Sequence, residues 1–266
     1  MSYRTRVLIV LALWLGASRC AYSQGKNVAV IDSGYFSPLT EGQLWCQFLT
    51  NHGYACTLFP KEGPTAPLDP FDVVVDISGQ WSDPTGMLAD CMRAGKTVIT
   101  VHLAPHVLGI KSNPTVQAWI GANATAPSAD QLVTTVRDPI LGDIPPGTEI
   151  INCADGPCWA VADTSGHPDA KVLASFAIFP IPDDSIGILR NIWEGGISVY
   201  LGPIYPFPSI YPLHGEIILN AVRARQLIPS VSTWGLLVLA LGISIAGTIL
   251  LRRQASTTRS RAFPIT

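Results

Sequence analysis

Short apolar runs alternate with amphipathic segments along the middle of the chain, between residues 26 and 226. Residues 27–32 form a nearly continuous apolar run, which is typical of a strand buried in a parallel sheet. Thr40 and Gln43 then match a capping box, and Gly53 is a stop signal for the helix that follows the box. The apolar side chains of this helix fall on one face: Leu44, Trp45, Phe48 and Leu49. The pattern therefore predicts a strand, a loop and a helix in this order.

The same order recurs in the next part of the chain. Residues 71–77 predict a second buried strand, and Asp83 followed by Pro84 predicts a helix N-cap with proline at the first helical position. Gly95 is a helix stop, and residues 96–102 predict a third strand. Alternation of this kind predicts an α/β three-layer sandwich with a mostly parallel, flavodoxin-like sheet.

The second half of the chain is less regular. Residues 107–165 are rich in Pro, Gly, Asn and Ala and show no period, so we expect an insertion, or loops and short helices, there. Residues 194–196 predict a hairpin turn, and an apolar helical face closes the domain. Further strands are predicted at residues 54–59, at a sheet edge, and at residues 171–179, 186–193 and 197–201, and the closing face consists of Ile217, Ile218, Ala221 and Val222.

The N-terminal end has the pattern of an export signal. Arg4 and Arg6 precede the apolar residues 7–15, and residues 21–23 (Ala-Tyr-Ser) offer small side chains at the two positions that a signal peptidase inspects. The sequence therefore predicts a signal peptide over residues 1–23. The alternative is an uncleaved anchor.

The C-terminal end has the pattern of a membrane span. Residues 234–251 carry no charge and extend about 27 Å as a helix, close to the roughly 30 Å of a bilayer core. Arg252 and Arg253 follow, and the positive-inside bias assigns the tail, residues 252–266, to the cytoplasm. We therefore expect one transmembrane helix with the domain, residues 24–226, outside the cytoplasm. The alternative of a buried core helix lacks a following domain to supply a core.

A short motif joins the domain to this span. Residues 227–233 form a tether, and residues 228–235 read Ile-Pro-Ser-Val-Ser-Thr-Trp-Gly. This block resembles the C-terminal protein-sorting signals of Gram-negative bacteria that read Ile-Pro-Thr-Leu/Val-x-x-Trp-Gly before a membrane helix and an Arg cluster, with Ser230 in place of Thr. The matching residues are Ile228, Pro229, Trp234 and Gly235. The resemblance implies a membrane-embedded sorting enzyme as partner, and a protein that stays anchored in the cell envelope or is released or surface-attached after processing.

Composition limits the partners of the domain. Charged residues make up 14% of the chain, against about 25% in typical soluble proteins, and the apolar ends explain part of this deficit. The formal net charge is −2, and residues 24–226 hold no Lys/Arg cluster, which argues against nucleic acid as a partner. About 200 residues are enough for one domain with a substantial core.

The cysteines fit an oxidising compartment. Removal of the signal peptide leaves an odd number of them, so at least one is a free thiol or forms an intermolecular bond. Cys153 and Cys158 bracket a turn-forming stretch, and we predict a disulfide between them. Cys46 with Cys56 is the second choice, and the pairing of Cys91 stays open. A zinc site is the alternative, but no Cys-x-x-Cys or Cys/His ligand spacing occurs.

Two stretches carry a family resemblance. Residues 98–104 (Val-Ile-Thr-Val-His-Leu-Ala), and residues 195–202 followed by 214–222, resemble the class I glutamine amidotransferase-like superfamily, in particular its non-amidotransferase branch with trehalose-utilisation-type domains. An active amidotransferase places a cysteine in a tight strand-to-helix turn of the form Gly-x-Cys-x-Gly. The corresponding turn here is residues 102–106 (His-Leu-Ala-Pro-His), with neither Cys nor Ser at its centre. The resemblance thus implies the fold without amidotransferase activity.

Open α/β sheets bind ligands outside the carboxyl ends of their strands. The residues expected there are Asp32, Ser33, Tyr35, Ser78, Trp81, His102 and His106. Tyr35 and Trp81 would form an aromatic wall, with Ser33, Ser78 and His106 as further ligand contacts, and carbohydrate is one ligand class that suits such a wall. In the alternative, Asp32 and Ser33 cap loops, Trp81 fills core and His102 is a hydrogen-bonded, half-buried histidine.

These observations favour an exported, membrane-tethered binding or interaction module without a cofactor or metal, because this interpretation needs no missing catalytic part. A carbohydrate or another envelope component is its expected ligand. The alternative is an extracytoplasmic hydrolase that uses His102 and Asp32 with an unrecognised nucleophile or metal. A third interpretation is a structural envelope component assembled through Cys-linked partners.

Overall fold

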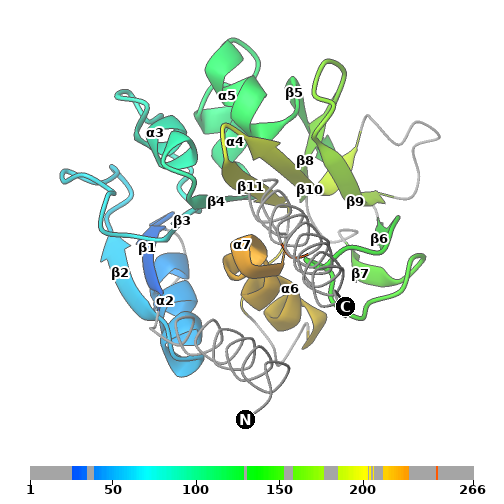
Figure 1. The fold of residues 1–266 in the computed structure, drawn as a ribbon, viewed down its shortest axis with the longest axis horizontal. Helices are drawn as coiled ribbons and strands as arrows, with labels where there is room; N and C mark the ends of the chain where they lie inside the picture. The colour runs from blue at the N-terminus through cyan, green and yellow to red at the C-terminus, as the bar shows by residue number, and fades with distance from the viewer. Residues whose placement is uncertain are drawn as a thin grey trace, which may run out of the picture. The chain divides into compact units, whose positions relative to one another are not determined.

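The computed structural model describes residues 26–34, 39–128, 131–152, 158–176, 185–202, 204, 206, 212–227 and 244. The chain divides into two compact units, Met1–Ala224 and Arg225–Thr266. The described residues of the first unit form an eleven-stranded sheet. Helices α2 (Glu41–Asn51) and α6 (Pro212–Val222) lie on one face of the parallel strands, and α3 (Met87–Arg93) and α5 (Pro114–Ile120) lie on the other (Figure 1). This arrangement confirms the α/β sandwich.

One half of the sheet is parallel, in the order β2-β1-β3-β4-β11. All five strands were predicted, and β2 lies at the sheet edge as expected. β1, β3 and β4 are buried along almost their whole length and are mostly apolar, as expected of strands whose two faces are covered. The bounds are Asn27–Ile31 for β1, Ala55–Phe59 for β2, Val73–Asp76 for β3, Thr97–Val101 for β4 and Gly196–Leu201 for β11.

The other half is antiparallel, so the prediction of a mostly parallel sheet is wrong there. β10 pairs with β11, and β9, β6 and β7 follow outward, while β8 pairs with β10 and β5 with β8. Four of these strands lie in residues 107–165, where we expected loops and short helices. Each of the four has only four or five residues, too short to establish a period. The bounds are Ala124–Ser128 for β5, Gln131–Thr134 for β6, Glu149–Asn152 for β7, Cys158–Ala162 for β8, Lys171–Phe176 for β9 and Ile186–Trp193 for β10.

Three of the described helices begin where a side chain accepts from their first N–H groups: Thr40 before α2, Asp83 before α3 and Asn113 before α5. The Thr40 hydroxyl accepts from the Gln43 N–H at 3.3 Å and the Gln43 side chain accepts from the Thr40 N–H at 2.9 Å, which confirms the capping box. Asp83 is not directly at the helix start as predicted, because a turn separates it from α3; its carboxylate still accepts from Met87 N and Leu88 N at 2.8 and 2.9 Å. The bounds are Glu41–Asn51 for α2, Met87–Arg93 for α3, Ala104–Val107 for α4, Pro114–Ile120 for α5, Pro212–Val222 for α6 and Ala224–Leu227 for α7.

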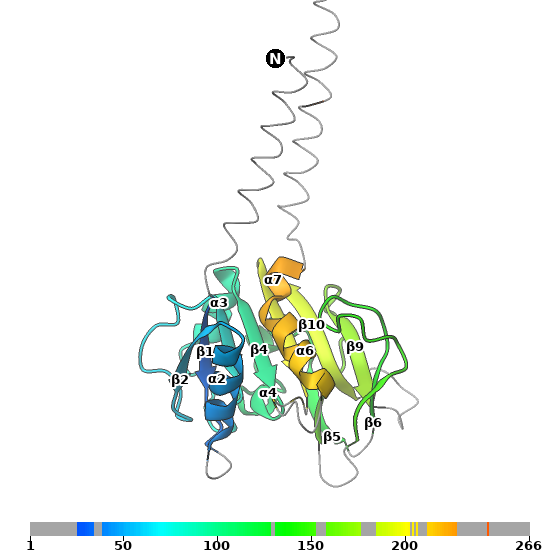
Figure 2. The same cartoon turned by 90° about the horizontal axis from the view of Figure 1, so that it is seen from below.

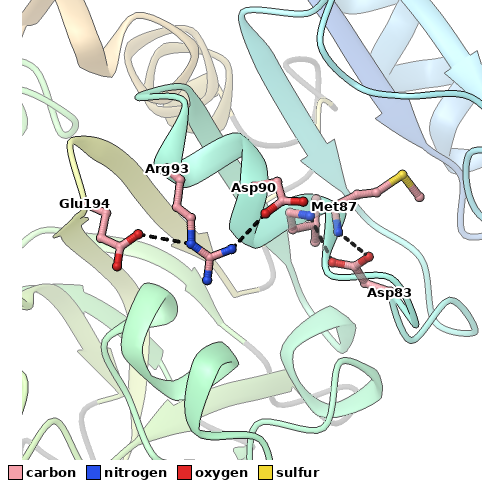
Figure 3. Close-up of polar contacts among 6 residues, drawn as sticks. Asp83, Met87, Asp90, Arg93 and Glu194 are labelled. Carbon is pink, nitrogen blue, oxygen red and sulfur yellow. Dashed lines mark hydrogen bonds and ion pairs between the residues drawn. The ribbon is translucent and has the colours of Figure 1, made fainter.

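The predicted hairpin turn between β10 and β11 consists of Glu194 and Gly195, at φ 47° and 88°. Positive φ at both central positions suits the twist of a two-residue hairpin. Arg93 ties this turn to α3, because its guanidinium contacts Asp90 at 2.8 Å and Glu194 at 3.1 Å (Figure 3). The guanidinium also lies over the Trp193 ring. These ion pairs are exposed, so each contributes little to the free energy of folding. Their main effect is to hold the turn against α3.

The cysteine predictions are partly tested. Cys46 and Cys56, the second choice, form a disulfide that joins α2 to β2. Cys158 is also disulfide-bonded, and its predicted partner Cys153 lies outside the described residues. Cys91 is a free, buried thiol. Among the residues that the structure covers, no cluster of three or more His, Cys, Asp or Glu side chains is arranged to hold a metal ion.

The terminal predictions lie almost wholly outside the described residues. This applies to the signal peptide at residues 1–23, the motif at residues 228–235 and the tail at residues 252–266. Of the predicted span, residues 234–251, only Ser244 is described. Within the described part of the chain, no helix has the length and apolar character needed to cross a bilayer.

Candidate functional site

A strained residue marks the carboxyl end of β4, one of the inner parallel strands. His102 directly follows β4 and has φ 52°, a conformation that costs a residue other than glycine on the order of 1 kcal/mol or more. Its N–H donates to the Leu201 and Gly202 carbonyls at 3.0 and 3.1 Å, and its carbonyl accepts from the Tyr200 hydroxyl at 3.1 Å. The end of β11 therefore holds the backbone of His102 on both sides.

This geometry corrects the expected centre of the turn. The sequence placed the empty nucleophile position at the middle of residues 102–106, on Leu103 and Ala104. Leu103 already has the right-handed conformation of the residue before α4, and Ala104 is the first residue of that helix. The sharp strand-to-helix elbow, where a nucleophile sits in enzymes with such a turn, is therefore occupied by the imidazole of His102.

Strand register brings several predicted site residues to one edge. Side by side across β1, β3, β4 and β11 lie Ile31, Asp76, Thr100 and Tyr200. Two residues farther along come Ser33, Ser78, His102 and Gly202. The pairing continues past the strand ends, because the Ile77 N–H donates to the Ile31 carbonyl at 3.2 Å. Ser33, Ser78 and His102 are thus expected to lie at one level of the carboxyl edge.

At the end of β1, Asp32 caps a helix and Glu41 lies beside it. The Asp32 carboxylate accepts from the Gly34 and Gly42 N–H groups at 3.2 and 2.8 Å. Glu41 is only 5% exposed. Burial raises the pKa of Glu41 to about 7, a hydrogen bond with the Ser33 hydroxyl opposes this rise, and the Asp32 charge adds to it. The sequence did not single out Glu41, because an acid in the first turn of a helix is ordinary and only the tertiary fold shows that it is buried.

At the end of β3, Asp76 is fully buried. One carboxylate oxygen accepts from the Ser78 N–H at 2.9 Å. Burial raises the pKa of Asp76 to about 7; the nearby Ser78 hydroxyl and N–H oppose the rise and the Asp83 charge adds to it. The other oxygen of Asp76 and the hydroxyls of Ser78 and Thr100 make no hydrogen bond within the described part of the chain. A protonated Asp76 satisfies such a neutral, enclosed environment better than a carboxylate does.

The expected aromatic wall is not formed by Trp81. Its side chain is 5% exposed and belongs to the core cluster. It packs so closely on Gly63 that a Cβ at that position would come within 2.3 Å of the indole. Trp81 therefore supports the core, as in the alternative interpretation, and Tyr35 lies outside the described residues.

A different aromatic pair lies next to the elbow. His106, in α4, is exposed, and its ring lies 5.3 Å from that of the partly exposed Trp159 in β8. The His106 Nδ1 atom is 3.3 Å from the Thr125 hydroxyl in β5. Figure 2 shows α4 at the end of β4, beside β5. Sequence reasoning missed Trp159 because it lies in the region without a detectable period.

Two cavities of about 440 and 350 Å³ border α3, away from the elbow. Cys91 lines the larger one, but its side chain is 4% exposed. Burial raises the pKa of Cys91 to about 11, so the thiol stays protonated at neutral pH. Neither described cavity includes His102, so both are separate from the elbow.

The fold is similar to that of several solved structures. No protein-family model and no curated protein sequence matches the chain. A ThuA-like protein from Bacteroides uniformis has a TM-score of 0.53 at 13% identity, over 76% of this chain and 92% of that one. A ThuA-like protein from Parabacteroides merdae has a TM-score of 0.52 at 10% identity, over 78% and 93%. A β-galactosidase from a Rahnella species has a TM-score of 0.52 at 11% identity, over 77% of this chain and 32% of that one. At these identities the similarity confirms the amidotransferase-like fold that the resemblance implied, and it concerns the fold alone.

Proposed function

We propose that this chain is an exported, membrane-tethered module that binds a small polar ligand at the carboxyl edge of its parallel strands, over His102. The observation that carries the proposal is the strained backbone of His102 at the elbow. The φ of His102, 52°, is unfavourable, and three hydrogen bonds with residues 200–202 hold the residue in this conformation. Strained residues that the surrounding structure over-determines gather at functional sites.

Binding accounts for the site better than amidotransferase chemistry does. Covalent acyl transfer needs a thiolate or alkoxide at the elbow, and His102 offers neither. His102 is partly exposed at this edge, and its imidazole suits a hydrogen bond with a hydroxyl-rich ligand. We therefore take carbohydrate as the ligand class to test first.

A hydrolase is the second candidate, and one observation favours it. General acid–base catalysis works best when the catalytic pKa lies near the operating pH, and the pKa of Glu41 is about 7. In this candidate Glu41 takes over the role first considered for Asp32, because the Asp32 carboxylate is engaged in capping α2. His102 would then orient the substrate or water.

The location is part of the proposal. It is supported by the apolar residues 234–251, the Arg pair after them and the sorting-like motif at residues 228–235. The partners are then the membrane, a membrane-embedded sorting enzyme and a carbohydrate or other envelope ligand, not nucleic acid. Protease added outside intact spheroplasts is expected to digest the domain. Full protection would refute this part of the proposal.

The binding claim is tested on the full chain in mild detergent. Titration with a panel of methyl glycosides is expected to give saturable binding that His102→Ala abolishes. His52→Ala is the matched control, because His52 is an exposed histidine at the end of α2. Equal binding by wild type and His102→Ala, or binding to neither, would refute a ligand site at the elbow.

A further inference from the structure

We propose that Trp159 and His106 form the ligand-stacking surface of this site and that Tyr200 is the residue that positions Trp159 against His102. The inference rests on the proposed binding function and adds the side chains that select the ligand. Trp159 takes the place that was expected for Trp81.

The first argument is the placement of an accessible indole. Among the described tryptophans, Trp45, Trp81 and Trp119 are buried, and Trp193 lies under the Arg93 guanidinium at the hairpin turn. Trp159 is partly exposed, and its described ring contact is with the exposed His106, at 39° between the ring planes. A partly exposed indole is stabilised when a flat apolar surface of a ligand covers it and removes it from water.

The second argument is the link to the elbow. The buried Tyr200 hydroxyl lies 2.7 Å from the Trp159 carbonyl and 3.1 Å from the His102 carbonyl. It therefore joins β8, which carries Trp159, to the turn that carries His102. Gly202 allows this close approach, because a Cβ there would lie 3.1 Å from the Trp159 carbonyl and 2.8 Å from the Gly187 carbonyl. The aromatic pair and the elbow thus form one fixed unit.

The third argument concerns chemistry. A stacking surface takes the flat C–H face of a ring, while polar groups at its border bind the ring's hydroxyls. The Thr125 hydroxyl lies beside His106, and His102 lies four residues earlier in the chain, just before α4. The site therefore distinguishes a ring-shaped polyol from an open-chain one.

The test uses the full chain in mild detergent and two probes: methyl β-D-galactopyranoside, which has a ring, and galactitol, which has hydroxyls without a ring. Wild type is expected to bind the ring probe about tenfold more tightly, the order of one aromatic contact. Trp159→Leu is expected to lose this preference, and Trp159→Phe to keep part of it. Trp193→Leu is the matched control and is expected to keep it fully.

Tyr200→Phe tests the positioning role. We expect it to reduce the ring preference and to move the imidazole NMR signals of His102 and His106, whereas His102→Ala abolishes binding of both probes. If Tyr200→Phe does not fold, the Trp159 variants decide. Ring preference kept by Trp159→Leu, while His102→Ala still abolishes binding, overturns this inference alone. Failure of wild type to bind either probe overturns the proposed function and the inference with it.

Discussion

Replacing Asp76 with asparagine is expected to stabilise the protein at alkaline pH. The carboxyl is fully buried, and burial raises its pKa from an ordinary 3.8 to about 7. A raised pKa means that the folded state holds the proton more tightly than the unfolded state does. The contribution of Asp76 to stability is therefore most favourable below about pH 4, falls as the pH rises toward 7, and stays low above it.

The size of this effect follows from the same values. A rise in pKa from 3.8 to about 7 corresponds to about 4 kcal/mol at about 1.36 kcal/mol per pH unit, which is an upper limit. An asparagine side chain at this position is neutral at every pH and keeps an oxygen to accept from the Ser78 N–H, so Asp76→Asn removes the charge without removing this bond. From pH 5 to pH 8 we expect the difference in unfolding free energy between variant and wild type to grow by about 3 kcal/mol at most, because only the part of the rise above pH 5 contributes.

Urea unfolding of the full chain at pH 5 and pH 8, followed by tryptophan fluorescence, measures the effect. Asp69→Asn is the control, because Asp69 is exposed. Glu41 leaves a residual pH dependence of the same sign, since burial also raises its pKa to about 7. If the difference in unfolding free energy between Asp76→Asn and wild type stays constant or shrinks toward pH 8, the reasoning is refuted.

Four further outcomes are expected. Thr40→Ala should lower the unfolding free energy by about 1 kcal/mol in urea titrations, because α2 loses its cap; no change would contradict this. Cys91 should react with a thiol reagent only after unfolding, because burial raises its pKa to about 11; rapid reaction in the native protein would contradict it. The protein should release no ammonia from glutamine, and turnover lost in His102→Ala would reveal an overlooked catalytic group. Mass mapping under non-reducing conditions should find Cys153 bonded to Cys158, and two free thiols would exclude that bond.

Local signals predicted the parallel half of the fold well. Each of its strands is a short apolar run, and the capping box of α2 needs only Thr40 and Gln43. The antiparallel strands in residues 107–165 have no such signal. β5 even contains Pro127, which lies opposite Trp159 in β8. Their pairing depends on contacts between distant parts of the chain, so the pattern of apolar and polar residues did not identify these strands.

The candidate site divides in the same way. A topological rule brought Ser33, Ser78 and His102 to one edge, because it needs only the strand ends. The burial of Glu41 and the contact of Trp159 with His106 depend on the tertiary structure. The local sequence does not predict them, because Glu41 is an ordinary acid in a first helical turn and Trp159 lies in an irregular region.

The most direct test of the central claim is the unfolding free energy of His102→Gly. Glycine adopts a φ of 52° without strain. If β11 holds His102 in a costly conformation for the use of its side chain, His102→Gly should be at least as stable as wild type. The control Gln47→Gly, at an exposed position inside α2, should lose about 1 kcal/mol. A loss in His102→Gly equal to that of the control would contradict the claim that strain is stored at the elbow.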